Sequence, residues 1–197
     1  METEIEAKWL NIDVSELRKL LKNLGATLEH SERLMKRRVF DYPDKRLDKI
    51  NGWVRVRDEG DKVTLSYKQL IDRSLHGTKE VTVVVDDFNT ACNLLESIGL
   101  ESFAYQETKR ESWRLDGVEV EIDTWPWIPS FVEVEAKSEQ SLKQAAQALG
   151  LDYSKALHGS VETAYQAVYN VTEAEVDSWE EIVFSDVPDW LKAKTIN

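Results

Sequence analysis

Alternating polar and apolar residues occupy much of the first 140 positions of the chain. Successive side chains of a β-strand point to opposite faces, so this alternation predicts strands. Eight stretches show it: residues 2–9, 34–41, 53–58, 62–70, 78–86, 103–115, 117–124 and 131–137. Turns are expected at residues 59–61 and 116–117, and a longer loop at residues 42–52. The pattern therefore predicts a protein dominated by β-strands.

Helical spacing of apolar residues interrupts the strands in three places, which are residues 14–24, 88–98 and 139–149. Each segment has a polar N-cap candidate and ends at a glycine. The cap candidates are Asp13 or Ser15, then Asp87, then Ser138 or Ser141. A fourth helix is expected near residues 160–169. The sequence thus predicts an α+β protein with a few short helices.

The composition is typical of a globular protein and limits the classes of partner that we expect. It has 197 residues, of which 42% are hydrophobic and 31% charged, and it contains one cysteine, Cys92. No apolar run reaches the ~20 residues that span a bilayer, so we expect a cytoplasmic protein without a membrane partner. The formal net charge of -12 argues against a nucleic-acid surface. No linker is visible, which predicts one domain over residues 1–172 and a tail or arm over 173–197.

The polar faces of the predicted strands are charged in an ordered way. In the first strand, Glu4, Glu6 and Lys8 share one face, opposite Ile5, Ala7 and Trp9. Other strands repeat this division, and their polar rows are Arg55 and Arg57; Thr64, Ser66 and Lys68; Thr78, Glu80 and Thr82; Glu119, Glu121 and Asp123; and Glu133, Glu135 and Lys137. Carboxylates therefore gather on some strands and cations on others.

This segregation of charge indicates a metal and a phosphate ligand. Neighbouring carboxylates repel by ~4 kcal/mol at 4 Å and an effective dielectric near 20, unless a cation lies between them. Paired carboxylates suit Mg²⁺ or Mn²⁺, whereas arginine and lysine suit phosphate oxygens. The simplest arrangement with charges inside and apolar residues outside is a closed antiparallel eight-stranded β-barrel with a polar lumen and flanking helices. We expect phosphoryl or nucleotidyl chemistry inside it.

These motifs resemble the CYTH family of triphosphate tunnel metalloenzymes. That family includes thiamine triphosphatases, inorganic triphosphatases and class IV adenylate cyclases. Its Glu-x-Glu-x-Lys signature is met at residues 4–8, and its Arg-x-Arg strand at Arg55 and Arg57. Later matches, in order, are Lys68, Glu80, Glu119, Glu121, Asp123, Glu133 and Glu135. The resemblance covers about residues 2–170 and implies the tunnel fold.

One motif departs from the family pattern. Many members carry Lys-x-Arg before the acidic strand, where this chain has Thr108-Lys109-Arg110. Alternation turns Lys109 outward unless a bulge re-aims it. Animal thiamine triphosphatases are similar here, and they also carry a tryptophan where this chain has Trp53, which could stack on a cationic heterocycle or simply pack. In the basic segment Lys36-Arg37-Arg38, the residue that points into the lumen is either Arg37 or Arg38, and the sequence does not distinguish them.

The resemblance implies roles for the charged residues. The metal ligands would be Glu4, Glu6, Glu119, Glu121, Asp123, Glu133 and Glu135, holding Mg²⁺ or Mn²⁺. The triphosphate would bind Lys8, Arg55, Arg57, Lys68, Lys109, Arg110 and Trp53. Glu133 or Glu135 would activate water, and Lys8 would assist catalysis. A triphosphatase is favoured over a class IV adenylate cyclase, and a non-catalytic polyphosphate-binding module is the third alternative. The acidic tail, with Trp179 and Trp190, could serve a homodimer interface.

Overall fold

The computed structural model describes residues 1–196, and of Glu2 only the backbone. The strands are β1 (Glu2–Thr3), β2 (Glu6–Trp9), β3 (Thr27–Asp41), β4 (Gly52–Asp58), β5 (Val63–Leu70), β6 (Thr78–Val85), β7 (Glu101–Leu115), β8 (Val118–Thr124), β9 (Phe131–Glu135) and β10 (Glu181–Ile182). The helices are α1 (Val14–Asn23), α2 (Phe88–Ser97), α3 (Glu139–Ala148), α4 (Glu162–Gln166), α5 (Glu173–Asp177) and α6 (Asp189–Lys192). Short 3₁₀ turns lie at η1 (Asp48–Ile50) and η2 (Tyr153–Lys155).

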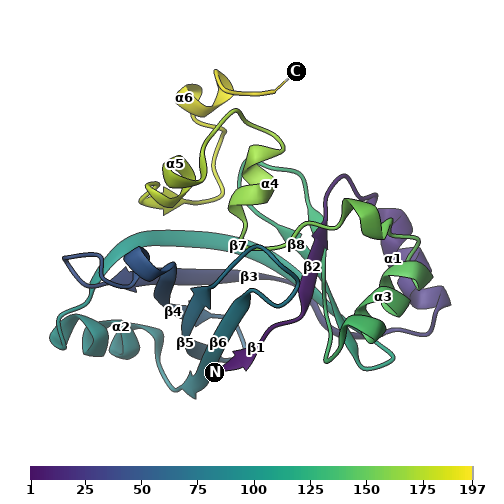
Figure 1. The fold of residues 1–197 in the computed structure, drawn as a ribbon, viewed down its shortest axis with the longest axis horizontal. Coiled ribbons are helices and arrows are strands. Elements are labelled where there is room, and N and C mark those ends of the chain that lie inside the picture. Colours follow the sequence, from purple (N-terminus) through teal and green to yellow (C-terminus); the bar gives the residue numbers. More distant parts are fainter. Residues whose placement is uncertain (197) are drawn as a thin grey trace.

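The strands form one curled sheet with flanking helices, as Figure 1 shows. The strand order is β1-β6-β5-β4-β3-β7-β8-β9-β2, and these neighbours pair antiparallel. Strand β10 adds to β7 in parallel. The predicted α+β class with an antiparallel sheet and flanking helices is confirmed.

The N-terminal segment connects with both ends of this strand order. Strand β1 pairs with β6 and strand β2 pairs with β9, and only Glu4 and Ile5 separate the two. The Glu4 amide also donates to the Thr78 carbonyl at 3.1 Å, and the Ala136 amide donates to the Ile5 carbonyl at 3.0 Å. The predicted first strand is therefore divided into two short ladders, one to each edge of the curled sheet.

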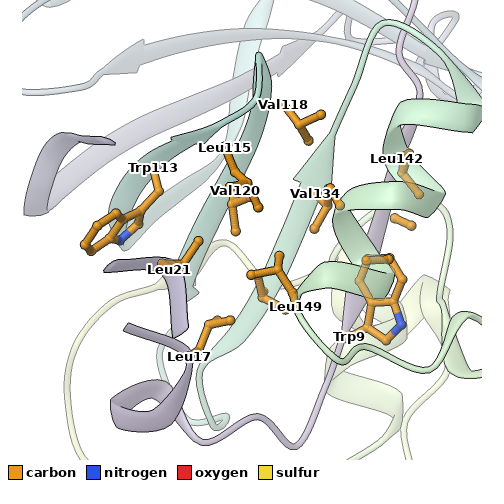
Figure 2. Packing of buried hydrophobic residues seen from close by; sticks show 14 of the residues in the cluster. Trp9, Leu17, Leu21, Trp113, Leu115, Val118, Val120, Val134, Leu142 and Leu149 are labelled. Carbon is orange, nitrogen blue, oxygen red and sulfur yellow. The ribbon is translucent and has the colours of Figure 1, made fainter. Parts of the chain in front are cut away.

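Two helices cover one face of the sheet around β2, β7, β8 and β9 (Figure 2). Leu17 and Leu21 of α1 and Leu142 of α3 pack against sheet residues such as Trp9 and Val120. Asp13 caps α1 by accepting from the Glu16 amide, a contact that stabilises a helix by about 1 kcal/mol. Asp87 and Ser138 cap α2 and α3 in the same way, so each cap is one of the residues expected from the sequence.

A second hydrophobic core lies between helix α2 and the sheet. Phe40 of β3 and Val56 of β4 are fully buried there with Cys92 and Leu95 of the helix. Cys92 is thus a packing residue. Strands β3 and β7 are each 15 residues long and pair with each other through register shifts. Residues 27–33 were not predicted as strand, because their alternation is weak.

The C-terminal segment packs on the turn between β8 and β9. Tyr165, Val176, Ile182 and Leu191 are buried together with Trp125 in a third core. The segment includes the predicted tail, while the domain boundary at residue 172 stays a prediction. Among residues 1–196, no helix is both long and apolar enough to cross a membrane.

Candidate active site on the inner face of the sheet

The charged rows of the strands share the sheet face that is turned away from α1, α2 and α3, here called the inner face. Ala7 and Trp9 of β2 enter the outer core with α1 and α3, so alternation turns Glu6 and Lys8 inward. In the same way, Val54 and Val56 of β4 pack toward α2, which turns Arg55 and Arg57 inward. The apolar outer cores therefore determine where the charged residues point.

Arg110 ties together the acidic residues of β8 and β9. Its Nε and Nη2 donate to the two oxygens of Asp123 at 2.6 and 2.5 Å, and Nη2 reaches Glu133 at 2.9 Å. On the other side of Glu133, the Lys8 Nζ lies 3.4 Å away and also donates to the Gly159 carbonyl. Burial would raise the pKa of Glu133, but Lys8 and Arg110 lower it to about 2.

Lys68 forms a second centre next to the N-terminal segment. Its Nζ lies 2.8 Å from Glu4 and 3.3 Å from Glu80, and Arg55 lies 3.3 Å from Glu80. Burial, together with a hydrogen bond to Glu80, raises the pKa of Glu4 to about 8. The pKa of Glu80 is lowered despite its burial, because Glu4, Lys68 and Arg55 all favour its charged form. Glu4 and Glu80 thus behave as a pair with one proton between them.

A third group contains carboxylates with weaker compensation. Glu135 stands opposite Glu6 on β2 and opposite Glu119 on β8. Burial, Glu6 and Glu119 raise the pKa of Glu135 to about 7, against the lowering effect of Lys68 and Arg110. Among the described residues, the Glu121 Oε2 is buried without a hydrogen-bond partner. These oxygen donors suit a hard divalent cation.

The carboxylates do not form a complete metal site by themselves. Within residues 1–196, no three Asp, Glu, His or Cys side chains lie close enough together to hold an ion. Lysine and arginine nitrogens stand between them, as Lys68 does between Glu4 and Glu80. A metal at this place would therefore require the cations to move onto another anion.

Four arginines converge on the basic side. Arg37 of β3 stands opposite Arg57 of β4, and Arg55 and Arg110 are near enough to affect its charge. Burial, followed by the neighbouring arginines, lowers the pKa of Arg37, and burial and Arg57 lower that of Arg55 to about 10. The Nε atoms of Arg37 and Arg55 are buried without hydrogen-bond partners in the described part of the chain. Such a group is suited to bind a polyanion.

Two predicted substrate contacts have different outcomes. Trp53 is two residues before Arg55 on β4, so the two side chains lie on the same face of the strand. It stands opposite Lys68 in the β4–β5 ladder, which places it on the inner face at the edge of the site. Lys109 points outward: its side chain is 43% exposed, 4.0 Å from Glu32, with its Nζ above the Phe184 ring. No bulge re-aims it, so the structure does not bring Lys109 to the other candidate residues.

One predicted ligand lies at the margin, and several contacts were missed. Glu119 is 43% exposed and pairs with Arg114 at 2.7 Å. The sequence left Arg37 and Arg38 as alternatives, and the pairing of Arg37 with Arg57 selects Arg37. The Gly159 carbonyl that accepts from Lys8 is 151 residues away in the chain, and no local pattern signals it.

The sequence matches the model of the CYTH domain over residues 2–165. This range covers most of the chain, so the protein belongs to the CYTH family. The ordered acidic and basic rows of the inner face are the residues on which the family resemblance was based. No curated protein matches the sequence.

Several solved structures share the fold. A candidate adenylate cyclase from Vibrio parahaemolyticus superposes with a TM-score of 0.72 at 14% identity, covering 84% of this chain and 98% of that one. A conserved hypothetical protein from Pyrococcus furiosus gives 0.64 at 22% identity, with 78% and 94% covered. HpAC1 from Hippeastrum, a candidate adenylyl cyclase with a dominant triphosphatase activity, gives 0.58 at 17% identity, with 85% and 96% covered. At these identities the likeness shows the fold alone.

Proposed function

We propose that this protein is a divalent-metal-dependent triphosphatase that hydrolyses inorganic tripolyphosphate, thiamine triphosphate or a nucleoside triphosphate. The reaction would take place on the inner face, within a closed eight-stranded tunnel that forms when the edges of the curled sheet meet along the N-terminal segment. Membership in the CYTH family and the triphosphatase activity described for HpAC1 support this proposal.

The observation that carries the proposal is the buried arginine group. Arg37 and Arg55 have lost their hydration, repel each other and have Nε atoms without partners in the described chain. Buried charge is costly unless a counter-ion accompanies it. A chain of phosphates offers several acceptor oxygens in a row, and it would engage Arg37, Arg55 and Arg57 together with Lys8, Lys68 and Arg110.

The acidic residues fit a divalent cation by their chemistry. All are oxygen donors, and the buried Oε2 of Glu121 has no hydrogen-bond partner among the described residues, although the Arg110 Nε lies 3.8 Å away. Mg²⁺ or Mn²⁺ would be held by residues chosen from Glu4, Glu6, Glu119, Glu121, Asp123, Glu133 and Glu135. When bound, the cation would neutralise phosphate charge and lower the pKa of a coordinated water.

Glu135 is better suited than Glu133 to accept a proton from the attacking water. A general base works best when its pKa is near the working pH. Burial and its acidic neighbours raise the pKa of Glu135 to about 7, whereas Lys8 and Arg110 lower that of Glu133 to about 2. In this proposal Glu133 instead keeps Lys8 and Arg110 in place beside the phosphates.

A class IV adenylate cyclase is the second candidate function, and Trp53 is the residue that supports it. An aromatic side chain on the inner face next to Lys68 could stack on adenine as well as on a thiamine ring. The outward position of Lys109 removes one contact expected near the α-phosphorus, which favours hydrolysis. A polyphosphate-binding module would not need the excess of carboxylates on β8 and β9.

The test offers tripolyphosphate, thiamine triphosphate and ATP to the purified protein with Mg²⁺, with Mn²⁺ or with EDTA. Phosphate, pyrophosphate and cyclic AMP are measured separately, and the expected product is phosphate in the presence of metal. Cyclic AMP as the main product would favour the cyclase, and binding without turnover would favour the binding module. Lys68→Met and Lys109→Met form a matched pair that removes one cation each: only the inner-face variant should lose activity.

A further inference from the structure

The turn between β8 and β9 contains the sequence Trp125-Pro126-Trp127, which has no role in the reaction proposed above. Trp125 follows directly on the acidic strand and is 7% exposed. Trp127 has a φ of 70°, a left-handed conformation that is uncommon for residues with a side chain. A strained and deeply packed turn is informative when it lies against a functional group.

Trp125 contacts Arg37 of the buried arginine group. The Arg37 Cζ lies 4.6 Å from the centre of the Trp125 ring. Nη2 of the same guanidinium donates to the Thr108 hydroxyl at 2.9 Å, while Nε has no partner among the described residues. The aromatic face offsets part of the cost of burying the cation and occupies none of its N–H groups. Thr108 and Trp125 together fix the plane of the guanidinium.

The C-terminal segment supports Trp125 from the other side. The Tyr165 ring meets Trp125 edge-on at 6.4 Å, and its hydroxyl donates to the Pro126 carbonyl at 3.0 Å. Trp179 packs edge-on against Tyr165 at 5.2 Å. Tyr165 is fully buried, so Trp125 cannot swing away from Arg37 without disturbing this core.

We infer that Trp125 is a positioning residue for phosphate binding, which acts by holding the Arg37 guanidinium over its ring. The inference rests on the proposed function in taking a polyphosphate as the ligand. It also gives the C-terminal segment a part in the site, because Tyr165 packs against the Trp125 ring and Trp179 packs against Tyr165.

The principal test replaces Trp125 with ring-fluorinated tryptophans carrying one to four fluorine atoms. Fluorine withdraws electrons from the ring with little change in shape, so it weakens the cation–π contact stepwise. The dissociation constant of tripolyphosphate, measured by calorimetry without metal, should rise with each fluorine. Trp125→Leu should raise it about tenfold and Trp125→Phe less. Affinity that is unchanged along the fluorine series would overturn the inference.

Two further measurements separate positioning from general packing. In an Arg37→Gln background, Trp125→Leu should cost no additional affinity, whereas an undiminished loss would show that the ring acts elsewhere. Trp113→Leu removes a buried tryptophan from the core that α1 and α3 share with the sheet, which contains neither Trp125 nor its supports Tyr165 and Trp179. It should lower thermal stability and leave tripolyphosphate affinity within about twofold. A loss of affinity as large as that of Trp125→Leu would contradict the inference.

The Arg37 side chain also gives a signal that does not depend on turnover. The ¹H–¹⁵N resonance of its Nε should be displaced by the ring current of Trp125 and should return toward ordinary arginine values in Trp125→Leu. If this holds but no triphosphate is hydrolysed, the proposed function fails and the positioning role stands. If triphosphate is hydrolysed but the resonance does not respond, the positioning role fails alone.

Discussion

The acidic and basic sides of the inner face differ in how their charges are compensated. On the acidic side, Glu133 has Lys8 at 3.4 Å and Arg110 at 2.9 Å, and Glu4 has Lys68 at 2.8 Å. On the basic side, the pKa values of Arg37 and Arg55 are lowered by burial and by neighbouring arginines. Glu133 and Glu4 thus each have a cation close by, whereas Arg37 forms no ion pair within residues 1–196 and Arg55 has Glu80 at 3.3 Å.

This difference suggests how the two ligands would depend on each other. A metal would have to compete with Lys8, Lys68 and Arg110 for the carboxylates, whereas a polyphosphate would meet the Nε atoms of Arg37 and Arg55, which lack hydrogen-bond partners among the described residues. Phosphate oxygens that bound Lys68 and Arg110 in the proposed complex would free the carboxylates for a cation. Metal and triphosphate should therefore bind with positive coupling, each raising the affinity of the other.

The largest expected effect is on turnover, from the acidic side. Glu6→Gln removes a carboxylate that stands opposite Glu135 and keeps the size of the side chain. We expect kcat to fall by more than about a hundredfold, since even outer-shell partners of a metal contribute up to this much. Glu32→Gln, an exposed change on the outer face, is the control and should keep full activity. Glu6→Gln with activity near that of the wild type would remove Glu6 from the metal site.

A large effect on stability is expected from the compensated cation. Lys8 is 1% exposed, and its Nζ is held between Glu133 and the Gly159 carbonyl. Lys8→Met leaves both of them without this donor, so we expect the free energy of unfolding to fall by about 3 kcal/mol. Urea denaturation of the ligand-free protein measures it. A loss below about 0.5 kcal/mol would mean that Lys8 contributes little to the fold.

Local pattern was enough to predict eight strand segments and four helices, including the one expected near residues 160–169, where α4 lies, but it missed residues 27–33 of β3 and the short strand β10. Asp13, Asp87 and Ser138 act as N-caps because capping depends on residues three positions apart. The parity of Lys109 also followed from alternation, although the family pattern had suggested a phosphate contact. The face of a strand on which a side chain lies could thus largely be predicted from the sequence of that strand.

Contacts between distant segments could not be predicted in this way. The division of the first strand into β1 and β2 depends on two different partners, β6 and β9, far along the chain. The stacking of Arg37 on Trp125 joins residues 88 positions apart. The ion pairs of the carboxylates with Lys8, Lys68 and Arg110 join different strands, so the pattern of any one strand does not reveal them.

An opposite sign of stability change is expected on the basic side. Arg37→Met replaces a buried cation that forms no ion pair within residues 1–196 with an apolar side chain of similar length. We expect the ligand-free protein to gain about 1 kcal/mol in urea denaturation, while tripolyphosphate affinity falls. Because Lys8→Met is the same kind of substitution, the pair tests the comparison directly. Destabilisation of both variants to the same extent would show that Arg37 supports the fold rather than a ligand.

The smallest expected effect concerns pH and Glu135. Burial, Glu6 and Glu119 raise the pKa of this carboxyl from 4.5 to about 7 in the folded protein. A group that holds its proton more tightly when folded stabilises the fold at low pH, and this stabilisation is lost as pH rises from 4.5 through 7. In EDTA, the protein should therefore lose less stability between pH 5 and pH 8 when it carries Glu135→Gln. An equal loss in both proteins would show that Glu135 is either hydrated or compensated by a cation, and burial beside Glu6 and Glu119 would then not raise its pKa.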